Sequence, residues 1–378
     1  TPLIGEPRPM LRLWLLLIVL LAARLLISLQ EEVFNLDEGT ISSIAAVMLD
    51  GGTVYRDAAS NRGPWTYGLY WLVAEAFGPF SLMPVRILAW IWGAVTVGLL
   101  AVIVGRLETP RAGLIAACCY TAFSTFYLLP MDGLAFNSSY MMVLPQLVGV
   151  TFLVGKQEPG RIRFLCAGIA VAIAGLFKQV ALVDVAFFAL LPLVLYGRRL
   201  DRDGIIAVVR AGIFLMLGVG IVMGLTHLYF YSLNAHEDFV FFFYEYGFNY
   251  YTKPVTLFVW IDSLFTGLFR LFRQGPIGFV VLGLFALDLA MRARSRGRLN
   301  WNDFTRTERF AILWIAIESV GVSTGGRFFG HYFLQTLAPL SLIAALTIPR
   351  VLDFLRLGGR KDRGVPIPTF IIRRNAAL

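Results

Sequence analysis

Long apolar runs follow one another along almost the whole chain and are separated by short polar or basic segments. A transmembrane helix needs about 20 mostly apolar residues. The stretch 164–196 is too long for one helix and is interrupted by Lys178 and Gln179, so we divide it in two. The pattern then predicts an all-α polytopic membrane protein with about ten transmembrane helices, at residues 11–29, 81–105, 112–130, 138–155, 164–177, 179–196, 211–231, 276–291, 309–323 and 332–349.

The first long polar segment, 30–80, has the pattern of a helix that lies on the bilayer surface. Apolar residues recur at helical spacing from Ile41 to Met48, and two glycines that can end a helix follow. We expect Asn35 to cap this helix and Glu38, three residues on, to complete a capping box. The segment therefore predicts a short interfacial helix.

Aromatic residues mark two further interfacial elements. Pro64 suits the first position of a second helix, and four aromatic residues typical of the lipid-water interface follow it. The second long polar segment, 232–275, is dense in Phe and Tyr, and after Pro254 it carries an apolar stripe opposite a polar one. This pattern predicts an amphipathic interfacial helix that either anchors the chain or lines a lipid or sugar groove, with Arg270 or Arg273 near a phosphate.

Composition excludes a soluble fold. Hydrophobic residues make up 58% of the chain and charged residues only 15%, whereas soluble domains contain about 25% charged residues. The three cysteines lie within apolar runs at spacings that do not indicate a metal site, and we interpret them as packing residues. We therefore expect a single transmembrane domain over residues 1–350 and a basic cytoplasmic tail over 351–378.

The net charge of +9 reports topology and not nucleic-acid binding. With the N-terminus inside, most Lys and Arg residues fall in every second loop, as expected for cytoplasmic loops. This sorting predicts a multi-pass cell (inner) membrane protein with both termini in the cytoplasm and a retained first helix. The cytoplasmic loops contain no Gly-rich phosphate cradle, so the function is expected on the external side.

Acidic residues dominate the first external segment. Residues 30–80 contain seven acids but only two bases, Arg56 and Arg62. For Asp37 and Glu38 a structural explanation is as good as a functional one, because acids in a first helical turn suit the helix dipole. A base beside Pro64 at headgroup depth, with carboxylates nearby, is what a site for a lipid phosphate and a hydroxyl acceptor requires.

The order of these motifs resembles the lipid-linked-sugar glycosyltransferases of the GT-C superfamily, most closely the branch with protein O-mannosyltransferases and aminoarabinose lipid A transferases. The resemblance rests on five pieces, whose order and external placement agree: Asp37–Glu38, Gly51 to Asp57, Arg62–Gly63–Pro64, Gly175 to Gln179, and Gly326 to Tyr332. It covers roughly residues 11–200 and the last of these motifs.

The resemblance implies a GT-C-like fold and a mechanism. A sugar would pass from a polyprenyl-phosphate donor to a hydroxyl of a protein, lipid or glycan, with Asp37 as the base and Glu38 positioning the acceptor or tuning that base. Arg62 and Lys178 match positions where the family neutralises the donor phosphate. The family usually has Lys at the first of these, and Arg can hold a phosphate equally well. Arg327 would contact the phosphate or close the cavity.

Several further residues have two interpretations. Lys178 either binds phosphate or pairs with Asp184, and Asp184 and Glu318 are intramembrane acids for which structural pairing is favoured. The turn after Pro130 is explained by turn chemistry alone, yet it can approach the first external segment. The secondary candidates for the substrate cavity are Tyr55, Asp57, Asp132, His331, Tyr332 and Arg270.

Metal dependence and activity also stay open in the sequence. The histidines with Glu237 and Asp238 show no ligand spacing on a predicted helix, so no metal site is predicted. A divalent cation is still possible. The alternative function is a catalytically silent GT-C-like membrane subunit or lipid-carrier-binding protein. A secondary transporter would show an internal repeat and broken midplane helices, and the sequence shows neither.

Overall fold

The computed structural model describes residues 7–30, 36–127, 130–246, 256–274, 276–296, 299–324 and 326–358. This described part is helical and contains no strand. Its first half comprises α1 (Pro7–Gln30), α2 (Leu36–Leu49), α3 (Pro64–Phe77), α4 (Leu82–Leu107), α5 (Pro110–Ala122), η1 (Phe123–Tyr127), α6 (Pro130–Gly133), α7 (Ser138–Leu153), α8 (Arg161–Gly175), η2 (Gln179–Val183) and α9 (Asp184–Leu195). Its second half comprises α10 (Arg202–Ser232), α11 (His236–Val240), η3 (Phe241–Glu245), α13 (Leu257–Gln274), α14 (Ile277–Arg296), η4 (Trp301–Asp303), α15 (Arg306–Ser323), η5 (Gly330–Thr336) and α16 (Leu337–Gly358).

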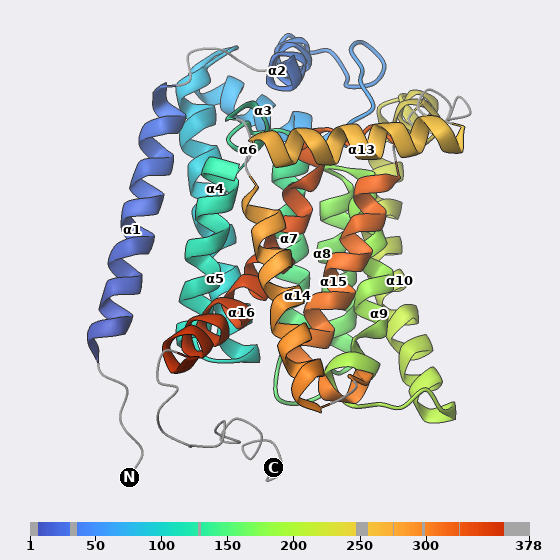
Figure 1. The fold of residues 1–378 in the computed structure, drawn as a ribbon. Coiled ribbons are helices and arrows are strands. Elements are labelled where there is room, and N and C mark those ends of the chain that lie inside the picture. Colours follow the sequence, from blue (N-terminus) through green and yellow to red (C-terminus); the bar gives the residue numbers. More distant parts are fainter. Residues whose placement is uncertain are drawn as a thin grey trace.

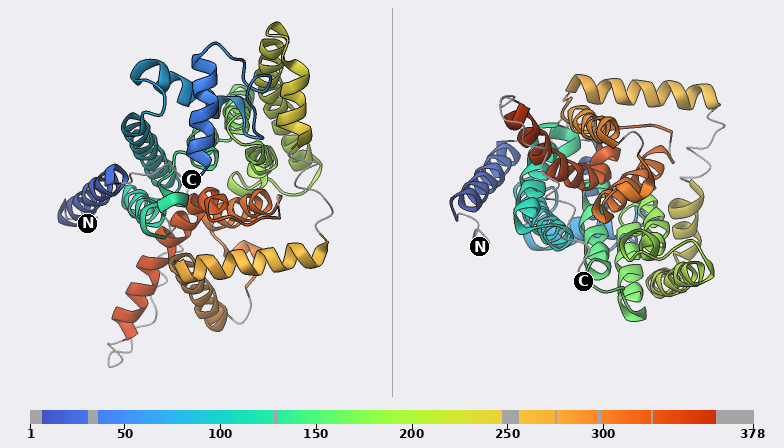
Figure 2. Two further views of the ribbon diagram at one scale, coloured as in Figure 1. Left: turned by 90° about the horizontal axis from the view of Figure 1, so that it is seen from above. Right: turned by 60° about the horizontal axis from the view of Figure 1, so that its bottom comes forward.

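The long helices stand side by side as a bundle, and most of the short ones gather at its upper end in Figure 1, while η4 lies at the lower end. There α2 and α3 cover the bundle and α13 lies across it, roughly at right angles to the long helices. Seen from above, α2 and α13 occupy different sides of this end (Figure 2). The described part of α1 begins, and that of α16 ends, at the lower end.

Proline and polar residues set the helix starts. Pro64 and Pro110 occupy the first turns of α3 and α5, where a missing backbone N–H costs nothing. Asn137 caps α7, because its side chain accepts a hydrogen bond from the Tyr140 N–H at 3.0 Å. The predicted break at Lys178 is confirmed, since α8 ends at Gly175 and η2 begins at Gln179.

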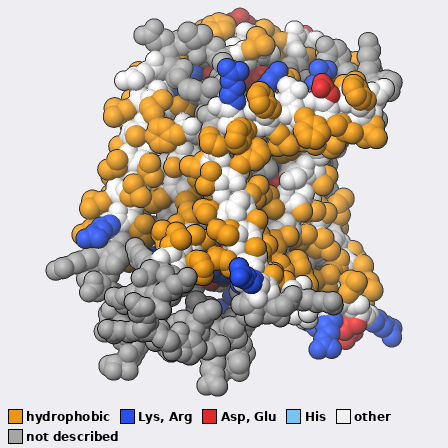
Figure 3. All heavy atoms as spheres, in the orientation of Figure 1, with side chains coloured by type: hydrophobic (Ala, Val, Ile, Leu, Met, Phe, Trp, Pro, Cys, Tyr) orange, Lys and Arg blue, Asp and Glu red, His pale blue; other side chains and the backbone are white. Residues whose placement is uncertain are grey.

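Hydrophobic side chains cover the middle of the face drawn in Figure 3, while charged ones gather toward its upper and lower edges. Among the described helices, four are long and apolar enough to cross a bilayer, and the bent pair α13 and α14 would add a fifth. Each of the ten predicted ranges falls on a helix. The polytopic helical class is confirmed, whereas the number of about ten spans stays a prediction.

The structure adds detail at two predicted boundaries, while the division into a domain and a tail stays a prediction. The helix α16 continues to Gly358, so the first eight residues assigned to a basic tail are helical, and 359–378 lie outside the described residues. The helices predicted after Asn35 and after Pro254 appear as α2 and α13, while their interfacial position stays a prediction. Asn35 itself lies outside the described residues, so its capping box is not observed.

Candidate active site

Asp37 and Arg62 form an ion pair at the upper end of the bundle. Asp37 lies in the first turn of α2, and one of its carboxylate oxygens accepts a hydrogen bond from the Arg62 guanidinium. Arg62 also donates to the Ser60 hydroxyl at 2.9 Å, and the Tyr55 hydroxyl donates to the Arg62 carbonyl at 2.7 Å. Both side chains of the pair stay partly exposed, at 23% for Asp37 and 18% for Arg62, so a substrate can reach them.

The turn between α8 and η2 packs directly against the start of α3. The Gly63 N–H donates to the Phe177 carbonyl, and the Trp65 N–H donates to the Leu176 carbonyl, both at 3.2 Å. A Cβ atom at Gly63 would lie 1.9 Å from that Leu176 oxygen, so only glycine permits this approach. Main-chain bonds therefore hold two of the motifs, Arg62–Gly63–Pro64 and Gly175 to Gln179, side by side.

Lys178 lies in this turn and points toward the same region. Its ammonium donates to the Ser139 hydroxyl at 2.6 Å and lies 3.6 Å from the centre of the Tyr332 ring, a cation-π contact. Burial lowers the pKa of Lys178 to about 7, while Asp37 raises it and Arg62 lowers it further. Asp184 instead lies close to Glu318 and Gln146 inside the bundle, and in the part of the chain that the structure describes no ion pair joins it to Lys178.

Glu38 is a buried link between helices. Its two carboxylate oxygens accept hydrogen bonds from the two terminal nitrogens of Arg86, at 2.7 and 2.9 Å. One oxygen also accepts from the Phe136 N–H at 2.8 Å. Glu38 is fully buried, and Arg86 is 4% exposed. The bidentate pair therefore fastens α2, the helix of Asp37, to α4 and to the segment before α7.

His331 connects Asp37 with the turn of Asp132. The His331 backbone N–H and the ring Nδ1 both lie 3.1 Å from the same Asp132 oxygen. The other ring nitrogen, Nε2, lies 3.8 Å from the Asp37 oxygen that does not face Arg62. A Cβ atom at Gly330 would meet an Asp132 oxygen at 2.2 Å, so glycine is needed for this contact.

The structure thus brings together six of the predicted residues, which come from five separate elements: Asp37, Arg62, Asp132, Lys178, His331 and Tyr332. We call this group the external cluster. Its members span nearly the whole chain, and two of its contacts join residues 199 positions apart. Such an assembly of two carboxylates, a histidine and two cations has the groups needed to accept a proton and to hold an anion.

The remaining candidates belong to segments at the same end of the bundle. Tyr55 is buried and supports Arg62 from behind. Asp57 is exposed, pairs with Arg56 at 3.1 Å and accepts from the Thr53 N–H, which makes it a turn residue. Arg270 is exposed on α13, and Arg327 is exposed just before η5. None of the contacts described above for the cluster involves these last two side chains.

Three residues around the cluster were not predicted: Arg24, Arg86 and Ser139. Arg24 lies within α1, is 3% exposed, and donates to the Gly133 carbonyl and the Tyr140 hydroxyl, both at 3.0 Å, which holds the turn of Asp132 in place. A signal existed for both arginines, since each interrupts an apolar run in which a charge needs a partner. Nothing in the sequence distinguishes Ser139.

Metal ligands are not grouped in the described residues. There, no set of three His, Cys, Asp or Glu side chains is arranged to hold a metal ion. His227 and His236 instead contact each other at 2.9 Å, and His227 also contacts the Tyr244 hydroxyl at 3.0 Å.

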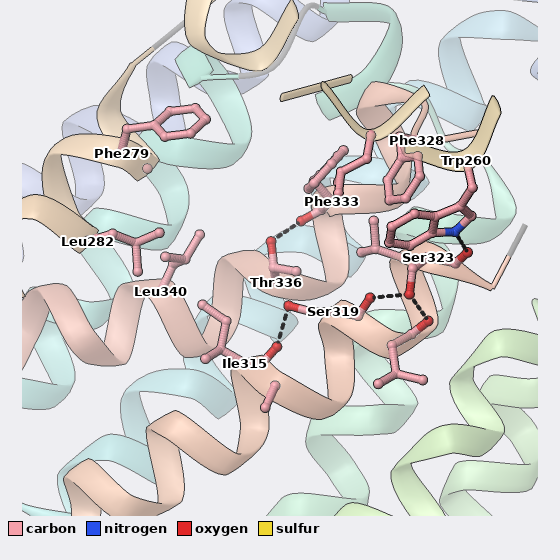
Figure 4. Close-up of a pocket in the computed structure, with 15 residues that line it drawn as sticks. Trp260, Phe279, Leu282, Ile315, Ser319, Ser323, Phe328, Phe333, Thr336 and Leu340 are labelled. Atoms are coloured by element: carbon pink, nitrogen blue, oxygen red, sulfur yellow. Dashed lines mark hydrogen bonds between the residues drawn. The ribbon is translucent and has the colours of Figure 1, made fainter. Parts of the chain in front are cut away.

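An apolar pocket of about 420 Å³ lies beside the external cluster, between α13, α14, α15 and η5. Figure 4 shows that its lining is mostly aromatic and aliphatic, with Trp260, Phe328 and Phe333 close together. Its hydroxyl groups already donate to backbone carbonyls, as Ser319 does to Ile315 at 2.7 Å. Phe328 and Phe333 line the pocket and flank His331 and Tyr332 in the chain, so this short segment contributes residues to both the pocket and the cluster.

Known proteins share this fold, although no protein-family model and no curated protein sequence matches the chain. The structure of ArnT from Cupriavidus metallidurans bound to undecaprenyl phosphate matches with a TM-score of 0.60 at 16% identity, over 91% of this chain and 62% of that one. The oligosaccharyltransferase of Archaeoglobus fulgidus in complex with Zn and sulfate matches with a TM-score of 0.51 at 15% identity, over 89% of this chain and 50% of that one. Its apo form gives 0.51 at 14% identity.

Both proteins are GT-C glycosyltransferases, and the chain has the GT-C fold, as the sequence resemblance implies. The chain spans less than two thirds of the length of either. At this level of identity the likeness concerns the fold.

Proposed function

We propose that this protein is a glycosyltransferase that moves a sugar from a polyprenyl-phosphate donor to a hydroxyl acceptor at the external face of the membrane. The observation that carries the proposal is the external cluster, in which Arg62 and Lys178 adjoin the Asp37 carboxylate on a GT-C fold. The match to an ArnT structure that contains undecaprenyl phosphate supports the donor class.

Each charged residue has a role in this proposal. Asp37 takes the proton of the acceptor hydroxyl as the hydroxyl oxygen attacks the anomeric carbon. Arg62 and Lys178 bind the donor phosphate and stabilise the charge that develops when it leaves. Arg327 contacts the phosphate or closes the cavity. Glu38 acts as a positioning residue, because its carboxylate is fully bonded within the protein to Arg86 and Phe136 and holds α2 in place.

The apolar pocket is proposed to hold part of the isoprenoid chain. Its lining offers apolar contacts, while its hydroxyl groups already have backbone partners. An uncharged chain would gain about 25 cal/mol for each Å² of apolar surface that it buries there. The short segment with His331 and Tyr332 would then lie between the lipid chain and the reacting sugar.

Orientation follows from the charge pattern. We infer that the upper end of the bundle in Figure 1, with the external cluster, faces the outside of the cell membrane, and that the described ends of α1 and α16 face the cytoplasm. The donor is then a lipid of the outer leaflet, and the acceptor is a protein or glycolipid hydroxyl.

Sugar transfer by the purified protein tests the proposal. The detergent-solubilised protein is incubated with radiolabelled undecaprenyl-phosphate or dolichyl-phosphate sugars and a membrane extract as acceptor. Asp37→Asn is expected to abolish transfer, and Arg62→Ala is expected to weaken binding of undecaprenyl phosphate. The matched controls are Asp50→Asn and Arg56→Ala, two exposed residues of the same external segment, and both should retain activity.

The outcomes separate the two candidate functions. Transfer that is lost in Asp37→Asn but kept in Asp50→Asn supports the glycosyltransferase. Tight binding of undecaprenyl phosphate without turnover of any donor would instead identify a silent lipid-carrier-binding relative. Transfer by Asp37→Asn and Arg62→Ala at the rate of the unaltered protein would refute the site.

A further inference from the structure

His331 has a defined orientation relative to Asp132. One Asp132 oxygen lies 3.1 Å from both the backbone nitrogen and the ring Nδ1 of His331. A carboxylate can only accept hydrogen bonds, so Nδ1 carries a proton and donates it to Asp132. In the neutral ring the second nitrogen, Nε2, then holds a free electron pair. This nitrogen faces Asp37.

The distance between His331 and Asp37 is one that a single oxygen atom can bridge. Nε2 lies 3.8 Å from the Asp37 oxygen, which is beyond a direct hydrogen bond. A hydroxyl group placed beside this gap can donate to either atom, and a water molecule can donate to both, at ordinary hydrogen-bond distances of about 2.8 Å. The other Asp37 oxygen is bonded to Arg62, so the oxygen nearer His331 is the one left for a substrate.

We propose that His331 is the final proton acceptor of the reaction and that Asp132 is its positioning residue. The inference rests on the proposed glycosyltransferase function. The acceptor O–H bond breaks and its proton moves to Asp37, and from there to Nε2 of His331 through a water molecule that bridges the gap. The acceptor oxygen bonds the anomeric carbon, and the bond from that carbon to the phosphate oxygen breaks with its electron pair left on the phosphate. The imidazolium lies between two carboxylates until the proton leaves to water.

The surroundings of His331 fit this role. The charged or titratable groups that face it are Asp37 from α2 and Asp132 from α6, with Tyr332 beside it in η5. Arg62 and Lys178 lie beyond Asp37. Gly330 leaves room for the Asp132 carboxylate. Arg24 donates a hydrogen bond to the carbonyl of Gly133, the residue after Asp132.

Chemical rescue tests the inference. In the transfer assay, His331→Ala is expected to lower kcat by about 100-fold, the smaller end of the range for a lost acid-base group. KM for the lipid donor should stay within about twofold, because the phosphate contacts are kept. Added imidazole should restore part of the rate, and substituted imidazoles of higher pKa should restore more. Asp132→Asn should lower kcat and shift its pH profile, since it changes the partner of Nδ1.

The control is His236→Gln, because His236 lies at the same end of the bundle, contacts His227 and forms no ion pair with an acid within the described residues. It should keep kcat and show no response to imidazole. Unchanged kcat in His331→Ala overturns the proton-acceptor role, as does a loss that imidazole does not restore. In either case transfer by the unaltered protein and its loss in Asp37→Asn leave the glycosyltransferase assignment intact. Absence of transfer by the unaltered protein overturns both.

Discussion

The buried pair of Glu38 and Arg86 gives the sharpest test of the architecture. Both side chains are almost completely removed from solvent, and two hydrogen bonds join them. Replacing Arg86 with Met leaves a carboxylate inside the bundle without its counter-charge. Breaking a buried pair in this way costs about 3–5 kcal/mol, because the remaining charge is desolvated and uncompensated. We expect Arg86→Met to lower the free energy of unfolding by that amount.

The assay uses the native cysteines. Cys118 is buried and Cys119 and Cys166 are partly buried, so a thiol-reactive fluorophore labels them faster as the protein unfolds in a titration with SDS. Fitting the labelled fraction against SDS gives the free energy of unfolding of each variant. The matched control is Arg106→Met on the same helix, because Arg106 is exposed and bonds only a backbone carbonyl, at 3.1 Å, among the contacts described. Its cost should stay below about 1 kcal/mol.

A double variant separates charge from packing. Glu38→Leu combined with Arg86→Met removes both charges and fills the space with apolar atoms, which is often neutral for a buried pair. The double variant should therefore be more stable than Arg86→Met alone. The reasoning is refuted if Arg86→Met costs no more than Arg106→Met. It is also refuted if the double variant costs as much as the single variants Glu38→Leu and Arg86→Met together.

Three further predictions follow from the site. Gly63→Ala should cost about 1–3 kcal/mol and weaken lipid phosphate binding, since the new Cβ would lie 1.9 Å from the Leu176 oxygen; Gly68→Ala, with no atom near its Cβ, is the control for the same SDS titration. The Lys178 ammonium loses its proton as the pH rises through about 7, whereas an arginine stays charged. The ratio between the affinity of Lys178→Arg for undecaprenyl phosphate and that of the unaltered protein should therefore rise between about pH 6 and pH 8. Equal pH dependence in thermophoresis would contradict the role of Lys178. Ser319→Phe should fill the apolar pocket and weaken binding of undecaprenyl phosphate more than binding of a short-chain prenyl phosphate, and an equal loss for both lipids would exclude the pocket as the chain site.

Local signals in the sequence predicted much of the fold. Apolar runs mark helices because buried and lipid-facing helices need them, and Pro64 and the polar break at Lys178 mark ends because they act within a turn of themselves. The number of membrane crossings was harder to predict from the sequence. Several helices of the bundle are short or carry buried charges, so length and apolarity do not decide whether each one crosses.

Pairing within the site could not be predicted in the same way. The partner of Glu38 lies 48 residues away and that of Asp132 lies 199 residues away, and both choices depend on how helices pack. The sequence could name Asp37, Arg62, Lys178 and His331 because a motif order resembles a known superfamily. It could not show that Glu38 is bonded inward while its neighbour Asp37 stays partly exposed and pairs with Arg62, since that depends on which side of α2 meets α4.

The external cluster has a consequence for how the protein is made. Asp37 leaves the ribosome long before His331 and Tyr332, which belong to η5. Until η5 folds against the earlier segments, Lys178 lacks its aromatic neighbour and Asp132 lacks its histidine. A nascent chain can therefore insert the helices that precede η5 without having a complete external cluster. The groups of the cluster come together only when η5 folds onto segments made long before it.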